Sequence, residues 1–528
     1  MVYNMLLVVL KPLLHSRLYY ITITRCKQSR LSKKGTNSVV CGKTIRIYMK
    51  VIKNYLYNAG YQLLAVLLPL ITAPYVSRVI GAHGIGINTA TNSTIQYFIL
   101  LGSIGIGFYG NREIAYLRSN KHDMSRAFWE IQLLKIVMVT FSYGAFLVYL
   151  AFCPVYKEYM LIQSINLVAA AFDISWLYMG LEDFKKTVLR NTMVKLASAA
   201  MIFLFVKDAG DTWVYIFVLA ISVLGGNLTL WPYIRKTLIK VDFKELHPFR
   251  HFKPTVTLFI PQIATQVYLV LNKTMLWAMV SSDVAGFYDR SDTLVKLVLT
   301  IVTATGTVML PHVAHAFHEG DIKAVNDMTA DSFDFVSCIA IPMFAGLAAI
   351  GQKLAPLFFG PQFKPVGMAV CLEAVVIVLI GWSNVVGQQY LLPTDRIKIY
   401  TGSVVAGAIV NLILNLPFIY LWGLHGAIMA TVSSEVVVTG YQLWHVRKDL
   451  DLKKMFHNVP KYAFAGIIMF IVVNRICIVF SPQTTLQNII MISLEIAAGV
   501  ATYAFGLLLL RPTILFKLKD IITKVRSK

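Results

Sequence analysis

The stretch TWVYIFVLAISVLGGNLTLWPYI, residues 212–234, has no charged side chain. A helix that crosses the hydrocarbon core of a membrane needs about 20 mostly apolar residues. In lipid the backbone must satisfy its own hydrogen bonds within a helix or a closed barrel, and barrel strands are short segments of alternating hydrophobicity. This long, unbroken apolar run therefore predicts a membrane-spanning α-helix.

The whole chain repeats this pattern. Its 528 residues are 57% hydrophobic and only 14% charged, with a mean hydropathy of +0.65, whereas a soluble domain is about 25% charged. We therefore predict an all-α polytopic membrane protein with about 14 spans. The candidate spans are residues 54–77, 86–109, 127–152, 158–180, 187–206, 212–234, 255–280, 289–311, 332–351, 365–390, 399–421, 424–446, 460–480 and 487–510.

Lysine and arginine in short loops indicate which side of the membrane faces the cytoplasm. If the first span starts in the cytoplasm, the inner loops and the C-terminal tail hold most of the basic residues. The outer loops then hold only Arg78, Lys157, Lys207, Lys353 and Lys364. This bias predicts that both termini are cytoplasmic and that the chain lies in the cell membrane.

Residues 1–48 differ from the rest because they hold nine Lys and Arg, no acid and no sustained helical period. They form either a basic tail that lies on anionic lipid or a segment before a later start at Met49, which is the reading we favour. The predicted domains are this extension (1–48), a first lobe of six spans (49–246), a second lobe of six spans (247–446), and two further spans with a basic tail (447–528).

The two lobes are predicted from a faint internal repeat. Residues 79–87, VIGAHGIGI, and residues 279–287, MVSSDVAGF, each join a first span to a second at an offset of 200 residues. Six spans separate them, so both lobes enter the membrane in the same sense. This predicts a parallel repeat with a pseudo-twofold axis along the membrane normal and a cavity between the lobes.

Ionisable and amide groups inside spans are costly and mark candidate sites. They concentrate in the first two spans of each lobe, so we expect a hydrated cavity there. Asp292 and Lys296 can pair at i, i+4 spacing, and cations would bind an anionic head group. The candidate substrate-binding residues are Arg78, Arg112, Lys273, Arg290, Lys296, Asn58, Asn88 and Asn92; the candidates for ion coupling are Asp173, Asp292 and Glu435.

No cofactor or metal site is predicted. The six cysteines form no CxxC pair and have no histidine at zinc spacing. The chain has no GxxxxGK[ST], HExxH or GxSxG motif. No loop is long enough to fold as a catalytic domain, which favours a transporter over an enzyme.

Several segments resemble, in order, the flippases of polysaccharide biosynthesis in the multidrug/oligosaccharidyl-lipid/polysaccharide exporter superfamily. The resemblance covers residues 49–450, and no single motif decides it. The matching segments are TAPYVSRVIG at 72–81, YGNREIA at 109–115, AGFYDRS at 285–291, MLP at 309–311, FGPQF at 359–363, Ser383-Asn384 with Gly387-Gln388, Asn411 with Asn415, and Gly426-Ala427 before Glu435.

The resemblance implies two six-helix bundles that expose a central site to one leaflet at a time. It implies that undecaprenyl-diphosphate-linked repeat units for capsule, O-antigen or exopolysaccharide are moved to the outer leaflet. Arg78, Arg112, Lys273 and Arg290 are the positions that match the cationic residues thought to hold the diphosphate. The implied partners are this lipid-linked oligosaccharide, membrane lipids and the polymerase and glycosyltransferases of the pathway, with no nucleic acid.

Three alternatives remain open at this point. A drug/cation antiporter of the same superfamily would need an acidic cavity, and the first two spans contain no acid. A flippase for the peptidoglycan precursor would carry another lipid diphosphate. A membrane-embedded repeat-unit polymerase would favour a large outer loop, which the chain lacks.

Overall fold

The computed structural model describes residues 36–479 and 484–516, and within them the regular structure is entirely helical. The first group of helices comprises α3 (Thr36–Ser103), α4 (Ile106–Leu117), α5 (Lys121–Phe152), α6 (Lys157–Phe172), α7 (Ser175–Gly180), α8 (Phe184–Phe205), α9 (Thr212–Leu228) and α10 (Ile234–Thr237). Short 3₁₀ turns η1 (Ala209–Asp211), η2 (Trp231–Tyr233), η3 (Phe243–Glu245) and η4 (Pro248–His251) lie among them and lead to the second group.

The second group begins with three long helices and continues with shorter ones. Its elements are α11 (Phe252–Met279), α12 (Ser282–His318), α13 (Ile322–Phe359), the turn η5 (Pro361–Phe363), α14 (Lys364–Glu373), α15 (Val376–Asn384), the π-helix η6 (Val385–Leu391), α16 (Ile397–Trp422) and α17 (Leu424–Val446). Three helices follow: α18 (Leu452–Phe456), α19 (Val459–Val479) and α20 (Thr485–Leu510).

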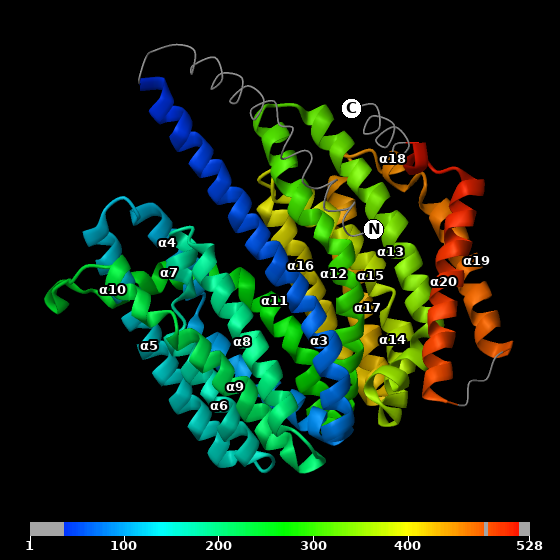
Figure 1. Cartoon of the computed structure of the whole chain (residues 1–528), viewed down its shortest axis with the longest axis horizontal. Helices are drawn as coiled ribbons and strands as arrows, with labels where there is room; N and C mark the ends of the chain where they lie inside the picture. The colour runs from blue at the N-terminus through cyan, green and yellow to red at the C-terminus, as the bar shows by residue number, and fades with distance from the viewer. Residues whose placement is uncertain (1–35, 480–483, 517–528) are drawn as a thin grey trace.

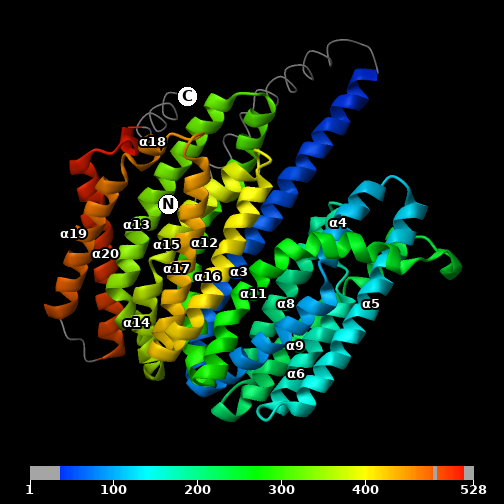
Figure 2. The same cartoon turned by 180° about the vertical axis from the view of Figure 1, so that it is seen from behind.

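The helices form two lobes, with α3 and α11 between them. Figures 1 and 2 show α4 to α10 on one side and α12 to α17 on the other. The last two helices, α19 and α20, pack against α13 at the edge farthest from the first lobe. The prediction of an all-helical membrane protein with two lobes and two extra C-terminal helices is thus confirmed.

Length and composition support fewer spans than the fourteen that the sequence predicts. Eight helices of the described residues are long and apolar enough to cross a membrane, and a pair bent by 45°, Pro361–Glu373 with Val376–Leu391, makes nine if it is one span. The other five predicted spans lie on α3, α11, α12 and α17. These helices carry the polar residues that suggested a cavity, and the count of fourteen stays a prediction.

The two lobes meet where each repeat element begins. Gly81 has a φ of +70° and forms an elbow within α3, after which Gly86 crosses Gly286 of α12. A Cβ on Gly286 would lie 2.9 Å from the Gly86 nitrogen, so the two backbones are in contact. His83 Nδ1 lies 2.9 Å from Asp283 Oδ1. Positions 200 residues apart therefore face each other, as a twofold axis between the lobes requires.

A further contact closes the same end of the molecule. Tyr156, in the loop before α6, lies with its hydroxyl 3.0 Å from the Ser282 hydroxyl at the start of α12. Together with the glycine crossing, it holds the first lobe against the second at this end. We call Gly86, Gly286, His83, Asp283, Tyr156 and Ser282 the closed-end contact.

Candidate functional site

A chain of alternating charges runs between α11 and α12. Lys273 of α11 donates a hydrogen bond of 2.6 Å to Asp289 and lies 3.7 Å from Asp292. Asp292 is 2.8 Å from Lys296, the partner that the i, i+4 spacing suggested. Arg290 lies 3.7 Å from the other oxygen of Asp289. We call these five residues, Lys273, Asp289, Arg290, Asp292 and Lys296, the charge chain. Its three cations and two carboxylates give one net positive charge.

Arg290 also links the two lobes. Its side chain is only 7% exposed, and its guanidinium lies over the Phe359 ring, 5.7 Å from the centroid. It lies close enough to interact electrostatically with Tyr215, which comes from α9 of the first lobe. Its Nε has no partner among the described residues. A buried cation with a spare donor can bind an anion.

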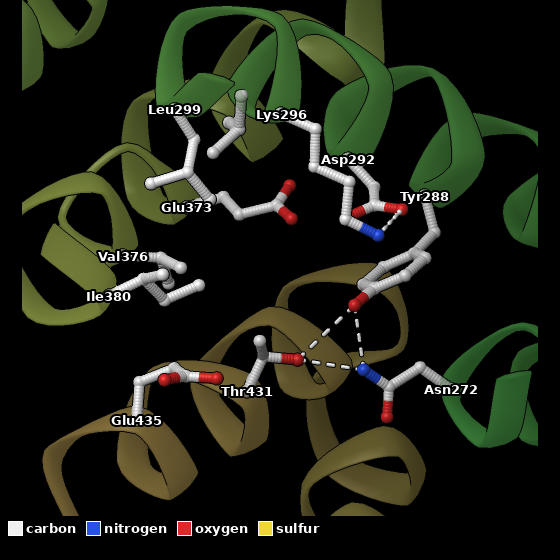
Figure 3. A pocket seen from close by; sticks show the side chains of 11 residues that line it. Asn272, Tyr288, Asp292, Lys296, Leu299, Glu373, Val376, Ile380, Thr431 and Glu435 are labelled. Carbon is white, nitrogen blue, oxygen red and sulfur yellow. Dashed lines mark hydrogen bonds and ion pairs between the residues drawn. The ribbon is translucent and has the colours of Figure 1, made fainter. Parts of the chain in front are cut away.

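The second half of the charge chain opens into a cavity inside the second lobe (Figure 3). Its volume is about 70 Å³, enough for a few water molecules. Asp292, Lys296, Glu373 and Glu435 contribute the charged groups. A sugar diphosphate is too large for this space, so the cavity as it stands suits water or a small ion.

A neutral network forms one wall of this cavity. Asn272 donates to the Tyr288 hydroxyl at 2.6 Å and to Thr431 at 2.7 Å, and Figure 3 shows the three side chains converging. Asn415, on α16, donates from its side-chain amide to the Asn272 side-chain oxygen Oδ1 at 2.7 Å. These bonds join α11, α12, α16 and α17, which sets the position of α11 and hence of Lys273.

Glu373 is a site residue that the sequence reasoning did not select. Its carboxylate is buried, accepts a hydrogen bond of 2.5 Å from Ser291, and points across the cavity toward Asp292 (Figure 3). It is the only carboxylate in the predicted span 365–390, and such a group inside a span is a site candidate. With Glu373 included, the lining holds three carboxylates and one lysine, so this cavity is acidic rather than cationic.

The predicted amides of the first lobe lie elsewhere. The Gln163 amide of α6 donates to Asn88 at 3.2 Å and lies 3.5 Å from the Asn92 amide. These two residues therefore pack α3 against α6. Asn58 belongs to α3, and its side chain lies outside the described part of the structure.

Arg78, Arg112 and Asp173 are also separate from the charge chain. Arg78 is exposed and donates to the main-chain carbonyl of Leu357 near the end of α13. Arg112 lies on α4 with its guanidinium 5.6 Å from the centre of the Tyr109 ring. Of the ion-coupling candidates, Asp292 and Glu435 share the cavity. Asp173 lies in the first lobe, 3.5 Å from Arg190.

A second charged cluster surrounds Glu130 of α5, whose side chain is fully buried. It accepts hydrogen bonds from the His247 backbone at 2.8 Å and from Arg126 at 3.2 Å, and it pairs with Arg250. Its other contact is His251 Nε2 at 2.9 Å. The sequence reasoning overlooked Glu130, although it is a carboxylate within the predicted span 127–152.

The protonation of His251 follows from its surroundings. Burial lowers the pKa of His251 below its usual value, so the ring is neutral at pH 7. A carboxylate only accepts, so Nε2 donates to Glu130 and Nδ1 accepts from the Tyr109 hydroxyl at 2.6 Å. The cluster thus fastens the segment between the lobes to α4 and α5.

Replacing Glu130 by glutamine should destabilise this attachment. We expect the free energy of unfolding to fall by about 2–3 kcal/mol, because hydrogen bonds to a charged group contribute roughly 1.5–3 kcal/mol. The measurement is thermal unfolding of the purified protein in detergent. Glu182→Gln, which removes an exposed pair with Arg118, should change the melting temperature little. Equal melting temperatures for both variants would contradict this role of Glu130.

Among the described residues, no group of three or more His, Cys, Asp or Glu is arranged to hold a metal ion. The chain is similar to known proteins along most of its length. Residues 51–317 match the family model described as "Polysaccharide biosynthesis protein". A candidate O-antigen transporter of Shigella dysenteriae is 23% identical over 397 residues, which cover 72% of this chain and 96% of that protein.

Two solved structures share the fold. The lipid II flippase MurJ in an inward closed conformation aligns with a TM-score of 0.66 and 17% identity, over 88% of this chain and 100% of that one. An inward-facing multidrug resistance transporter of the MATE family aligns with a TM-score of 0.57 and 14% identity, over 71% and 94%. Both are membrane transporters, which agrees with a multi-pass transporter fold for this chain.

Proposed function

Since the chain belongs to the polysaccharide biosynthesis protein family, we propose that it moves lipid-linked oligosaccharide across a cell membrane. The family match over residues 51–317 carries this proposal, and the similarity to a candidate O-antigen transporter supports it. The substrate would be an undecaprenyl-diphosphate-linked repeat unit that moves from the cytoplasmic to the outer leaflet. Capsule, O-antigen or exopolysaccharide would be built from it.

The charge chain supports a role in holding the diphosphate. This charge chain contains three cations on α11 and α12, namely Lys273, Arg290 and Lys296. In this structure the carboxylates of Asp289 and Asp292 form ion pairs with these cations. A diphosphate offers charge-assisted hydrogen bonds that can replace those of a carboxylate, so substrate binding would exchange partners rather than expose bare charges.

The two-lobe arrangement supports alternating access. The closed-end contact joins the lobes near Gly86 and Gly286, and the charge chain lies farther along α12. Opening one end while the other closes would carry the head group past the charge chain. Asp292 and Glu435 are the proposed coupling groups, because they line a cavity of the size of a few waters or a small ion.

We propose that both termini are cytoplasmic, as the loop charges favour. The chain would act as a transporter and not as an enzyme. Glycosyltransferases would supply its substrate on the cytoplasmic side, and a polymerase would use the product on the other side.

One observation favours a second function. The cavity of the second lobe holds Asp292, Glu373 and Glu435, and an acidic cavity suits a cationic compound, as a drug/cation antiporter of this superfamily would require. The charge chain beside it, with its excess of cations, argues for the anionic substrate.

Transport into proteoliposomes separates these functions. The purified chain is reconstituted and given an undecaprenyl-diphosphate oligosaccharide, lipid II or a cationic dye in separate assays. We expect the oligosaccharide lipid to reach the opposite leaflet faster than in protein-free liposomes, as measured by an impermeant sugar-oxidising reagent. Movement of lipid II alone or of the dye alone would replace the proposed function with the corresponding alternative.

A further inference from the structure

A second cavity lies in the same lobe, between α15, the π-helix η6, α16 and α17, with a volume of about 330 Å³. Its polar lining consists of amides, hydroxyls and one carboxylate, and among the residues that the structure describes no lysine or arginine lines it. The groups that the argument uses are Asn384, Gln388, Tyr400, Glu435 and Gln442. We call it the amide cavity.

The π-helix determines which glutamine faces the amide cavity. In η6 the side chain of Gln389 is buried, accepts a hydrogen bond from Ser332 at 2.5 Å and donates to Asn384 at 3.3 Å. The neighbouring Gln388 is exposed and lines the cavity. Gln389 thus anchors the π-helix to α13, while the preceding Gln388 presents its amide to the cavity. Single π-helical turns within α-helices occur frequently at functional sites.

Gln442 of α17 leaves an acceptor unused. Its side chain is 1% exposed, and its amide nitrogen donates to Ser403 at 3.0 Å. Its amide oxygen has no hydrogen-bond partner among the described residues. Leaving a buried acceptor unpaired is costly. A ligand hydroxyl that donates to this oxygen would remove the cost.

The amide cavity adjoins the charged cavity. Ile380 and Glu435 line both, so the two cavities are direct neighbours within the second lobe. The charged cavity continues through Asp292 into the charge chain and Lys273. The order along the lobe is therefore cations, carboxylates and then amides.

We propose that the amide cavity binds an uncharged sugar of the lipid-linked oligosaccharide; this proposal rests on the proposed function. A sugar hydroxyl both donates and accepts, and so does an amide side chain. The Tyr400 ring offers an apolar face for the C–H groups of a sugar. With no cation in the lining, and with Glu435 present, a sugar acid would be disfavoured. The residues that select the sugar are therefore Gln388 and Gln442.

The test measures binding to the full-length protein in detergent. The probes are undecaprenyl diphosphate alone and the same lipid bearing one N-acetylhexosamine, one neutral hexose or one glucuronic acid. We expect at least one neutral sugar to increase the affinity over that of the bare lipid, and glucuronic acid not to. Gln388→Ala should remove most of this gain and leave the affinity for bare undecaprenyl diphosphate unchanged.

Two comparisons keep the result interpretable. Gln352→Ala, on the exposed surface of α13 outside both cavities, should retain the full gain. Gln442→Leu provides the second variant, and its melting temperature reports whether it is folded. If no neutral sugar adds affinity, or if Gln388→Ala keeps the gain, the sugar site is wrong. If no undecaprenyl lipid binds at all, the proposed function fails instead.

Discussion

Replacing Gly286 by valine is expected to abolish polysaccharide export while the protein still reaches the membrane. A Cβ at this position would lie 2.9 Å from the Gly86 nitrogen and 3.0 Å from its Cα. Both atoms belong to the main chain, so no side-chain rotation can relieve the contact. The lobes would have to separate at the closed-end contact, and the end that should shut during transport would stay open.

The measurement is surface polysaccharide in cells whose own copy of the gene is deleted, together with the amount of the variant in the membrane. Gly440→Val is the matched control, because a Cβ at Gly440 of α17 meets no atom within 4 Å. Cysteines at positions 83 and 283 joined by a short thiol-reactive cross-linker act in the opposite direction, because the cross-link should hold this end shut and block export. Normal export by Gly286→Val would show that the glycine crossing has no part in transport.

The apolar helices could be predicted closely because lipid imposes their length. The predicted spans 212–234, 399–421 and 487–510 correspond to α9, α16 and α20. The long helices α12 and α13 extend well beyond predicted spans 289–311 and 332–351. Hydropathy reports only the part of a helix that lies in hydrocarbon, and these helices continue outside it.

The break between α14 and α15 could not be predicted in the same way. It falls at Ala374 and Val375, within an apolar run that contains no proline at that point. Local composition therefore favours an uninterrupted helix. The bend and the π-helix that follows it depend on packing against α12 and α13, which only the folded structure supplies.

The site was predictable where its residues share one helix. Asp292 and Lys296 follow from their spacing, whereas the pairing of Lys273 with Asp289 depends on how α11 is rotated against α12. The amides of α3 show the opposite case. A polar stripe can face water or another helix, and Gln163 satisfies Asn88 and Asn92 from α6. No pattern within one helix distinguishes these outcomes.

Replacing Lys273 by methionine is expected to abolish export through two separable effects. The side chains of Lys273, Asp289 and Asp292 are 21%, 22% and 13% exposed, so the pair is largely shielded from water. Removing one partner of an isolated buried pair costs about 3–5 kcal/mol of stability. We expect a smaller loss here, because Asp289 keeps its contact with Arg290 and Asp292 keeps its pair with Lys296. If Lys273 also holds the diphosphate, export is lost even when stability is restored.

The double variant Lys273→Met with Asp289→Asn separates the two effects. It removes both charges of the closest pair and should regain part of the melting temperature measured in detergent. The recovery is only partial because Arg290 loses its contact with Asp289. Export should stay absent in this double variant. Lys157→Met, at an exposed position at the start of α6, should leave export and stability unchanged. If export recovers together with stability, the role of Lys273 is purely structural. Arg290 and Lys296 would then be the residues that bind the diphosphate.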